Sequence, residues 1–323
     1  MTILTYPLTR ILIPFDGSPA ARLALELAAT LVRAGGEAVE NLTLLRVIGG
    51  SYLSRHIQNV DLRVTHMDQV KEWQRIKKHY LDEEIYPLLA EAEQILRDLG
   101  VTRPITQRVG EGKVGDEIIR LATEEAFSTI IMGRRGLSPI KELLLGSATQ
   151  KVLSYAQGMT VYVMGQQLGP DPNCPIAPLL VPIDGSEPSL EAVRQAVALT
   201  QAFQNYKPHL TLLHVVDLAV LGQRISGETT PAQLTDLLDK QEQEFLEEGR
   251  KILRQSGLNG LWEEKLLTGN PPQVIAQEAE VGQYAMIMMG KKGRSALESL
   301  LIGSVASSVL HRVSRPTVAL VCR

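Results

Sequence analysis

Three glycines and a serine recur at the same spacing in the two halves of the chain. They spell G-x2-G-x9-G-S, first as Gly133, Gly136, Gly146 and Ser147, and again as Gly290, Gly293, Gly303 and Ser304. A glycine after a buried strand lets the backbone turn with positive φ and lets a ligand approach the main chain, and the N–H groups that open a helix attract anions. Two copies in register therefore predict a phosphate-binding loop in each half. The alternative is a pair of tight strand–helix turns kept by duplication.

Basic residues cluster around both glycine patterns. They are Arg134, Arg135 and Lys141 in the first half, and Lys291, Lys292 and Arg294 in the second. The whole chain is slightly acidic, with 33 Lys and Arg against 36 Asp and Glu. We therefore expect a local anion site in each half. The net charge offers no field to hold a nucleic-acid backbone, so we expect no nucleic-acid partner.

A P-x-D-G-S motif follows the first predicted strand of each half, at the edge where open α/β sheets bind ligands. Its proline and aspartate are Pro14 and Asp16 in the first half, and Pro182 and Asp184 in the second. Each carboxylate either accepts hydrogen bonds from a ribose or base, or forms an Asx-turn that caps the next helix. Both interpretations are open from the spacing. Val47 and Val215 end the second predicted strand, where backbone groups are placed to contact an adenine edge.

The glycine pattern belongs to a longer internal repeat. ILIPFDGS in the first copy matches LLVPIDGS in the second, and NLTLLRVI matches HLTLLHVV. A stretch rich in Pro and Gly, 166–178, separates the copies and has the composition of a linker. We predict two domains, 1–165 and 179–323.

Each copy alternates short apolar runs with helix-period stretches, which is typical of βα units on a parallel sheet. The predicted strands cover 11–14, 42–48, 107–109, 129–132 and 160–164, and the second copy ends with a strand over 317–321. Ser18 is the predicted N-cap of the first helix. Further helices are expected over 116–125 and from near Gly146, and Pro87 marks a kink or a new helix start.

The segments 51–80 and 218–240 differ in length and charge between the copies. They are candidate lids or partner surfaces, with plain solvated helix as the alternative.

Composition excludes several classes of protein. With 44% hydrophobic and 21% charged residues, and no apolar run of membrane length, the chain is expected to be globular, with no membrane contact. The first ten residues lack an apolar run of signal-peptide length. Cys174 and Cys322 are too few for a disulfide scaffold, and no His or Cys spacing fits a metal site. We expect a cytoplasmic protein that holds no metal on its own side chains.

Four features together resemble the universal stress protein family in tandem form. These are D-G-S after the first strand, L-L-x-V in the second, M-G-x2-G-x9-G-S and an apolar closing strand. The resemblance covers nearly the whole chain. It implies two tandem Rossmann-like domains of the adenine nucleotide alpha hydrolase type, each a five-stranded parallel α/β sheet flanked by helices. It also implies that the closing strands VYVMG and TVALV pair, which makes an intramolecular pseudo-dimer and leaves further homodimerisation open.

The resemblance further implies an ATP site in each half, occupied together with Mg²⁺. The adenosine part falls to Asp16, Val47 and Met132, or to Asp184, Val215 and Met289, and the phosphates fall to the glycine pattern and its serine. The complete set of predicted binding residues is Pro14, Asp16, Val47, Met132, Gly133, Arg135, Gly136, Gly146, Ser147, Ala148, Pro182, Asp184, Val215, Met289, Gly290, Lys292, Gly293, Gly303, Ser304 and Val305. None of them is predicted to be catalytic.

Three functional hypotheses follow from these residues. The favoured one is an ATP-binding stress or regulatory protein in which nucleotide stabilises one arrangement of the partner surface. The second is a slow ATPase, or an enzyme that phosphorylates itself on Ser147 or Ser304. The third is a scaffold that binds no nucleotide and acts through its surface.

Overall fold

The computed structural model describes residues 4–49, 74–136, 145–217, 231–294 and 301–322. Lys141 and most of the two candidate lids therefore lie outside the described residues. The strands of the first half are β1 (Arg10–Pro14), β2 (Asn41–Ile48), β3 (Ile105–Glu111), β4 (Thr129–Met132) and β5 (Met159–Val163). The strands of the second half are β6 (Leu179–Pro182), β7 (Leu210–Val216), β8 (Trp262–Thr268), β9 (Met286–Gly290) and β10 (Thr317–Cys322).

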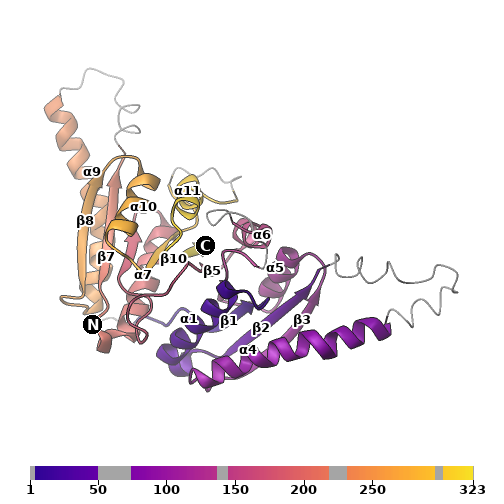
Figure 1. The fold of residues 1–323 in the computed structure, drawn as a ribbon. Coiled ribbons are helices and arrows are strands. Elements are labelled where there is room, and N and C mark those ends of the chain that lie inside the picture. The colour runs from indigo at the N-terminus through magenta and orange to yellow at the C-terminus, as the bar shows by residue number, and fades with distance from the viewer. Residues whose placement is uncertain (1–3, 50–73, 137–144, 218–230, 295–300, 323) are drawn as a thin grey trace.

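These strands form one ten-stranded sheet with the order β3-β2-β1-β4-β5-β10-β9-β6-β7-β8. Neighbours pair in parallel, except that β5 and β10 pair antiparallel, with Val161 opposite Leu320 and Tyr162 opposite Ala319. Figure 1 shows the two halves meeting at these strands, and both strands are fully buried. The predicted pairing of the closing strands, and with it the pseudo-dimer, is confirmed.

Helices cover both faces of the sheet, as expected for parallel strands whose apolar runs are buried on two sides. One core cluster packs under α1 (Pro19–Gly35), α4 (Tyr86–Asp98), α7 (Glu187–Ala202) and α9 (Pro231–Ser256). The other packs under α5 (Val114–Glu124), α6 (Ser147–Tyr155), α10 (Pro271–Val281) and α11 (Ser304–Arg312). Each cluster draws residues from both halves, so the two halves share their cores.

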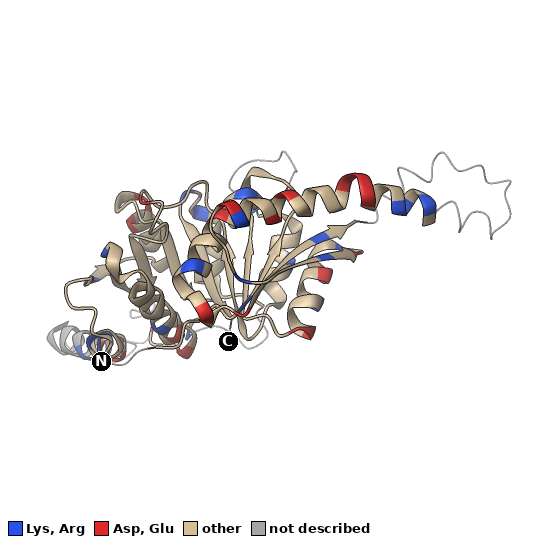
Figure 2. Cartoon of the chain, turned by 90° about the horizontal axis from the view of Figure 1, so that it is seen from below, with Lys and Arg blue, Asp and Glu red and all other residues tan. Residues whose placement is uncertain are grey.

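Charge follows the same layering. Figure 2 shows residues of both signs on the helices and outer strands, with few on the central strands. Within the described part of the chain, no helix combines the length and apolarity needed to cross a membrane.

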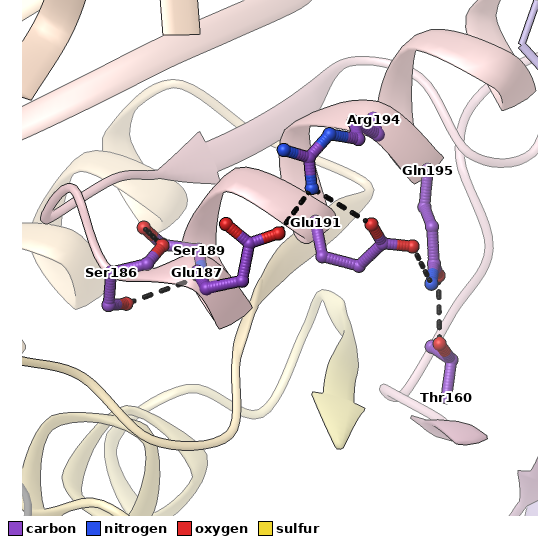
Figure 3. A network of polar contacts seen from close by, with 7 residues as sticks. All are labelled: Thr160, Ser186, Glu187, Ser189, Glu191, Arg194 and Gln195. Carbon is purple, nitrogen blue, oxygen red and sulfur yellow. Dashed lines mark hydrogen bonds and ion pairs between the residues drawn. The ribbon is translucent and has the colours of Figure 1, made fainter. Parts of the chain in front are cut away.

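A polar network also connects the halves (Figure 3). Thr160 of β5 donates from Oγ1 to Gln195 Oε1 of α7 at 2.8 Å, and Gln195 Nε2 donates to Glu191 at 3.3 Å. Arg194 donates to Glu191 at 3.1 Å and to Glu187 at 2.7 Å. Glu191 is buried, and these donors satisfy its carboxylate. The first half is thus tied to the second by side chains as well as by strands.

The predicted strand 107–109 is shorter than the strand in the structure, whereas Pro87, predicted to mark a kink or a new helix start, does lie at the start of a helix. The predicted strand 107–109 is part of β3, which runs from Ile105 to Glu111, because all seven residues pair with β2 although the edge position leaves all but Gly110 partly or fully exposed. Pro87 lies in the first turn of α4, directly after a π-helical turn, Leu81–Ile85. Proline has no N–H to donate, so the wider turn before it replaces the regular hydrogen bond.

Ser18 caps α1 as predicted, and its counterpart Ser186 caps α7. Ser18 Oγ accepts from Ala21 N–H at 3.2 Å, and Ser186 Oγ accepts from Ser189 N–H at 3.4 Å. We expect Ser18→Ala to lower the free energy of unfolding by about 1 kcal/mol, the usual value of an N-cap. Ser186→Ala should cost more, because Ser186 Oγ also donates to Asp184 at 2.6 Å. Urea denaturation of both variants measures this, and equal losses would contradict it.

Candidate nucleotide site

A cavity of about 460 Å³ opens at the carboxyl ends of β1, β2 and β4. It contains every first-half residue that the sequence singles out for binding. Those residues are Pro14, Asp16, Val47, Met132, Gly133, Arg135, Gly136, Gly146, Ser147 and Ala148. Their contact with a nucleotide stays a prediction, but the fold brings them around one volume, and that volume falls in the range of small-molecule sites.

The strand order explains why the cavity lies there. The chain leaves β1 for α1 on one face of the sheet, and leaves β4 for α6 on the opposite face. β1 and β4 are neighbours, so the two connections diverge at their carboxyl ends and leave a crevice between them. β6 and β9 repeat this arrangement in the second half.

The glycines of the loop allow close approach of the chain to itself, not the positive φ that the sequence analysis predicts. A Cβ on Gly133 would lie 2.8 Å from the Arg135 carbonyl oxygen, and one on Gly136 would lie 2.2 Å from Asp16 Oδ2. Neither glycine has a left-handed φ. Positive φ occurs instead at Gly17, at +81°, in the D-G-S turn. The loop turns on ordinary dihedrals; a side chain at Gly133 would meet backbone, and one at Gly136 would meet the Asp16 carboxylate.

Asp16 forms the predicted Asx-turn and also lines the cavity, where its contact with a ribose or base stays a prediction. Its Oδ1 accepts the Ser18 N–H at 3.0 Å, which is the Asx-turn of the capping interpretation. Its Oδ2 faces Gly136, and the residue lines the cavity. The carboxylate therefore holds the end of β1 while leaving a polar surface in the site.

The start of α6 forms one wall of the cavity. Gly146 is its N-cap residue, without a side-chain cap, and the first turn carries no acidic residue. The Gly146 N–H donates to the Arg134 carbonyl at 3.0 Å, and Thr149 Oγ1 donates to the carbonyls of Gly133 and Arg134, both at 3.1 Å. These bonds hold the loop against the helix, and the N–H groups of Ser147 and Ala148 have no partner within the helix. An anion is the natural acceptor at such a helix start.

The second half repeats the arrangement with a different set of hydrogen bonds. Asp184 Oδ1 accepts from Ser186 N–H at 3.0 Å, and its Oδ2 accepts the Arg294 N–H at 3.0 Å. A Cβ on Gly293 would lie 2.4 Å from Asp184 Oδ2. The remaining predicted residues lie at the corresponding ends of β6, β7 and β9 and at the start of α11, namely Pro182, Val215, Met289, Gly290, Lys292, Gly303, Ser304 and Val305.

Two of the basic residues predicted to surround the loops turn away from them. Arg134 is 7% exposed and donates from Nη1 to the Leu310 carbonyl of α11 at 2.5 Å. Lys291 is 5% exposed and donates from Nζ to the carbonyls of Ser154 and Ala156, at 3.0 and 2.8 Å. Burial lowers the pKa of Lys291, and burial with the neighbouring Arg135 lowers the pKa of Arg134 to about 10. Arg134 stays charged at neutral pH, and the basic side chain left beside each glycine loop is that of the next residue, Arg135 or Lys292.

The cavity also contains residues that the sequence analysis did not single out. Ile118 and Val114 of α5 add an apolar wall beside Val47, and Arg46 lines the cavity next to that valine. The apolar periodicity of the predicted helix 116–125 indicates that Ile118 faces inward. Nothing in the sequence indicates that Val114 or Arg46 lines the cavity, because a valine and an arginine at the end of an element fit many other roles.

Within the described residues, no group of three or more His, Cys, Asp or Glu side chains is placed to hold a metal ion. The carboxylate among the cavity-lining residues is Asp16.

The fold is an α/β sheet with a topological switch point in each half, and the described cavity lies at the one in the first half. A model of the universal stress protein family matches residues 7–163 and, a second time, residues 176–320. The chain therefore belongs to the universal stress protein family, as a tandem member.

Individual relatives agree with this assignment. A universal stress protein of Mycolicibacterium smegmatis is 28% identical over 242 residues, which cover 71% of this chain and 74% of the relative. One from Methanocaldococcus jannaschii is 29% identical over 140 residues, covering 43% of this chain and 79% of the relative. The crystal structure of a universal stress protein from Archaeoglobus fulgidus superposes with a TM-score of 0.65 at 21% identity, covering 100% of this chain and 98% of that one. This last likeness concerns the fold.

Proposed function

We propose that this chain is an ATP-binding regulatory protein of the universal stress protein family, acting in the cytoplasm. The observation that carries the proposal is the first-half cavity, where a glycine loop and the start of α6 meet an apolar wall. Val47, Met132 and Ile118 provide apolar surface for an adenine ring. Backbone N–H groups of the loop and helix, with Arg135, provide donors for phosphates. The equivalent residues of the second half make a second site.

ATP would bring Mg²⁺ with it, because Mg²⁺ is commonly bound through phosphates, water and few protein carboxylates. The negative charge of bound nucleotide would order the loops. A partner protein that recognises the ordered loops would thereby respond to the nucleotide concentration. Asp16 Oδ1 is engaged by the Ser18 N–H, so its position supports binding in preference to the activation of a water for hydrolysis.

Isothermal titration of nucleotide-free protein with ATP and Mg²⁺ tests the proposal. We expect about two ATP per chain, with dissociation constants no weaker than about 1 mM, which corresponds to roughly 4 kcal/mol of binding free energy. One ATP per chain would assign binding to a single half. ADP release on longer incubation would favour the enzyme hypothesis, and absence of both heat and any shift in melting temperature would favour the scaffold hypothesis.

A further inference from the structure

The two glycine loops are linked to each other by a closed ring of contacts through the last helices. The Arg134 carbonyl accepts the Gly146 N–H at the start of α6, while its side chain donates to Leu310 in the last turn of α11. In the other half, the Lys291 carbonyl accepts the Gly303 N–H at 2.9 Å, and its side chain donates to the end of α6. Each loop therefore holds the start of its own helix and the end of the other.

The chemistry of these links suits a mechanical connection. A cation at a helix C-terminus interacts favourably with the helix dipole and with carbonyls that have no partner in the helix. Both side chains are buried, so solvent screens neither contact strongly. Burying a charge is costly unless it is hydrogen-bonded, and Nη1 of Arg134 has its acceptor in a carbonyl of the opposite half, whereas Nε and Nη2 are buried without a hydrogen-bond partner among the described residues. Moving either loop therefore disturbs a buried contact across the seam, that is, the boundary between the two halves where β5 pairs with β10.

The position of Arg134 in the loop connects this ring to ligand. Gly133 and Arg135, on either side of it, both line the cavity, whereas Arg134 is not among the lining residues. A phosphate that orders the flanking residues must fix the Arg134 backbone and, through its side chain, the end of α11. α11 begins at Ser304, which is predicted to contact the phosphates in the second site.

We propose that Arg134 and Lys291 are positioning residues that couple the two nucleotide sites, so that ATP in one site strengthens binding in the other. The inference rests on the proposed ATP binding. Binding at the first site orders the start of α6 and, through Arg134, the end of α11. The second nucleotide then meets a helix that is already ordered, which is the origin of positive cooperativity without a large structural change. Lys291 carries the reciprocal effect to α6.

Hydrogen exchange of the full chain, read by mass spectrometry, tests this coupling. Gly293→Val blocks the second site so that ATP and Mg²⁺ load the first. We expect slower exchange in residues 147–150, which reports local binding, and exchange slowed by about fivefold or more in residues 304–313 of the other half, the lower end of usual coupling strengths. Adding Arg134→Met should abolish the remote effect and keep the local one.

Arg312→Met serves as the matched control, since it removes an exposed cation from the same last turn of α11. The remote effect should survive it. Should Arg134→Met fail to fold, the reciprocal experiment uses Gly136→Val with Lys291→Met and reads residues 147–156. Local slowing without remote slowing, or remote slowing that survives both Arg134→Met and Lys291→Met, would overturn the coupling. No local slowing would overturn ATP binding itself, and the coupling with it.

Discussion

Gly136→Val is expected to weaken ATP binding at the first site by about a hundredfold or more. A Cβ at this position would lie 2.2 Å from Asp16 Oδ2, closer than any real contact, and Asp16 is held by the Ser18 N–H through its other oxygen. The valine must therefore displace the Asp16 carboxylate or push the loop away from β1. If that removes two backbone hydrogen bonds to charged phosphate oxygens, the loss is about 3 kcal/mol or more, which is roughly two decades of affinity.

Titration calorimetry with ATP and Mg²⁺ measures this effect, and Gly293→Val should do the same to the second site. The Gly136→Val, Gly293→Val double variant should bind no measurable ATP while keeping the far-UV circular dichroism of the parent, because Gly136 is exposed and the new side chain enters no core. Adding Asp16→Ala relieves the clash and should recover any lost stability, but it should not recover affinity, because Asp16 is itself a predicted contact of the adenosine part. A double variant that binds ATP like the parent would show that the phosphates lie elsewhere.

The sequence predicts the strands and the place of the cavity well because both depend on local patterns. Thr129–Met132 is β4 to the residue, and Ser18 is the N-cap of α1, since a buried apolar run and an N-cap serine act within a few residues. The pairing of the closing strands follows from the family resemblance. Gathering of Asp16 and Gly136 around one cavity follows from parallel strands ending at one edge of the sheet.

What the sequence does not predict depends on contacts between distant segments. Arg134 and Arg135 are adjacent and chemically identical, yet one crosses to α11 and the other lines the cavity. Nothing in their spacing tells them apart, because the acceptor of Arg134 is supplied by a residue more than a hundred positions away, on the other side of the seam. The predicted positive φ at Gly133 is wrong for a similar reason. A crowding neighbour and a left-handed turn both select glycine, and only the packing distinguishes them.

Leu320→Ala is expected to lower the free energy of unfolding by about 2–5 kcal/mol, the usual cost of truncating a fully buried leucine. Leu320 has no exposed surface and lies in β10 opposite Val161 of β5 and beside Met289 of β9. The cavity would therefore open in a core cluster that both halves share. We expect a single cooperative transition that shifts as a whole, because neither half can lose the seam without exposing the other's core.

Leu266→Ala is the matched control, since Leu266 of β8 is 51% exposed and should cost well under 1 kcal/mol. Urea denaturation followed by fluorescence and circular dichroism measures both variants, and two separate transitions, with only the later one shifted, would show that the halves fold independently.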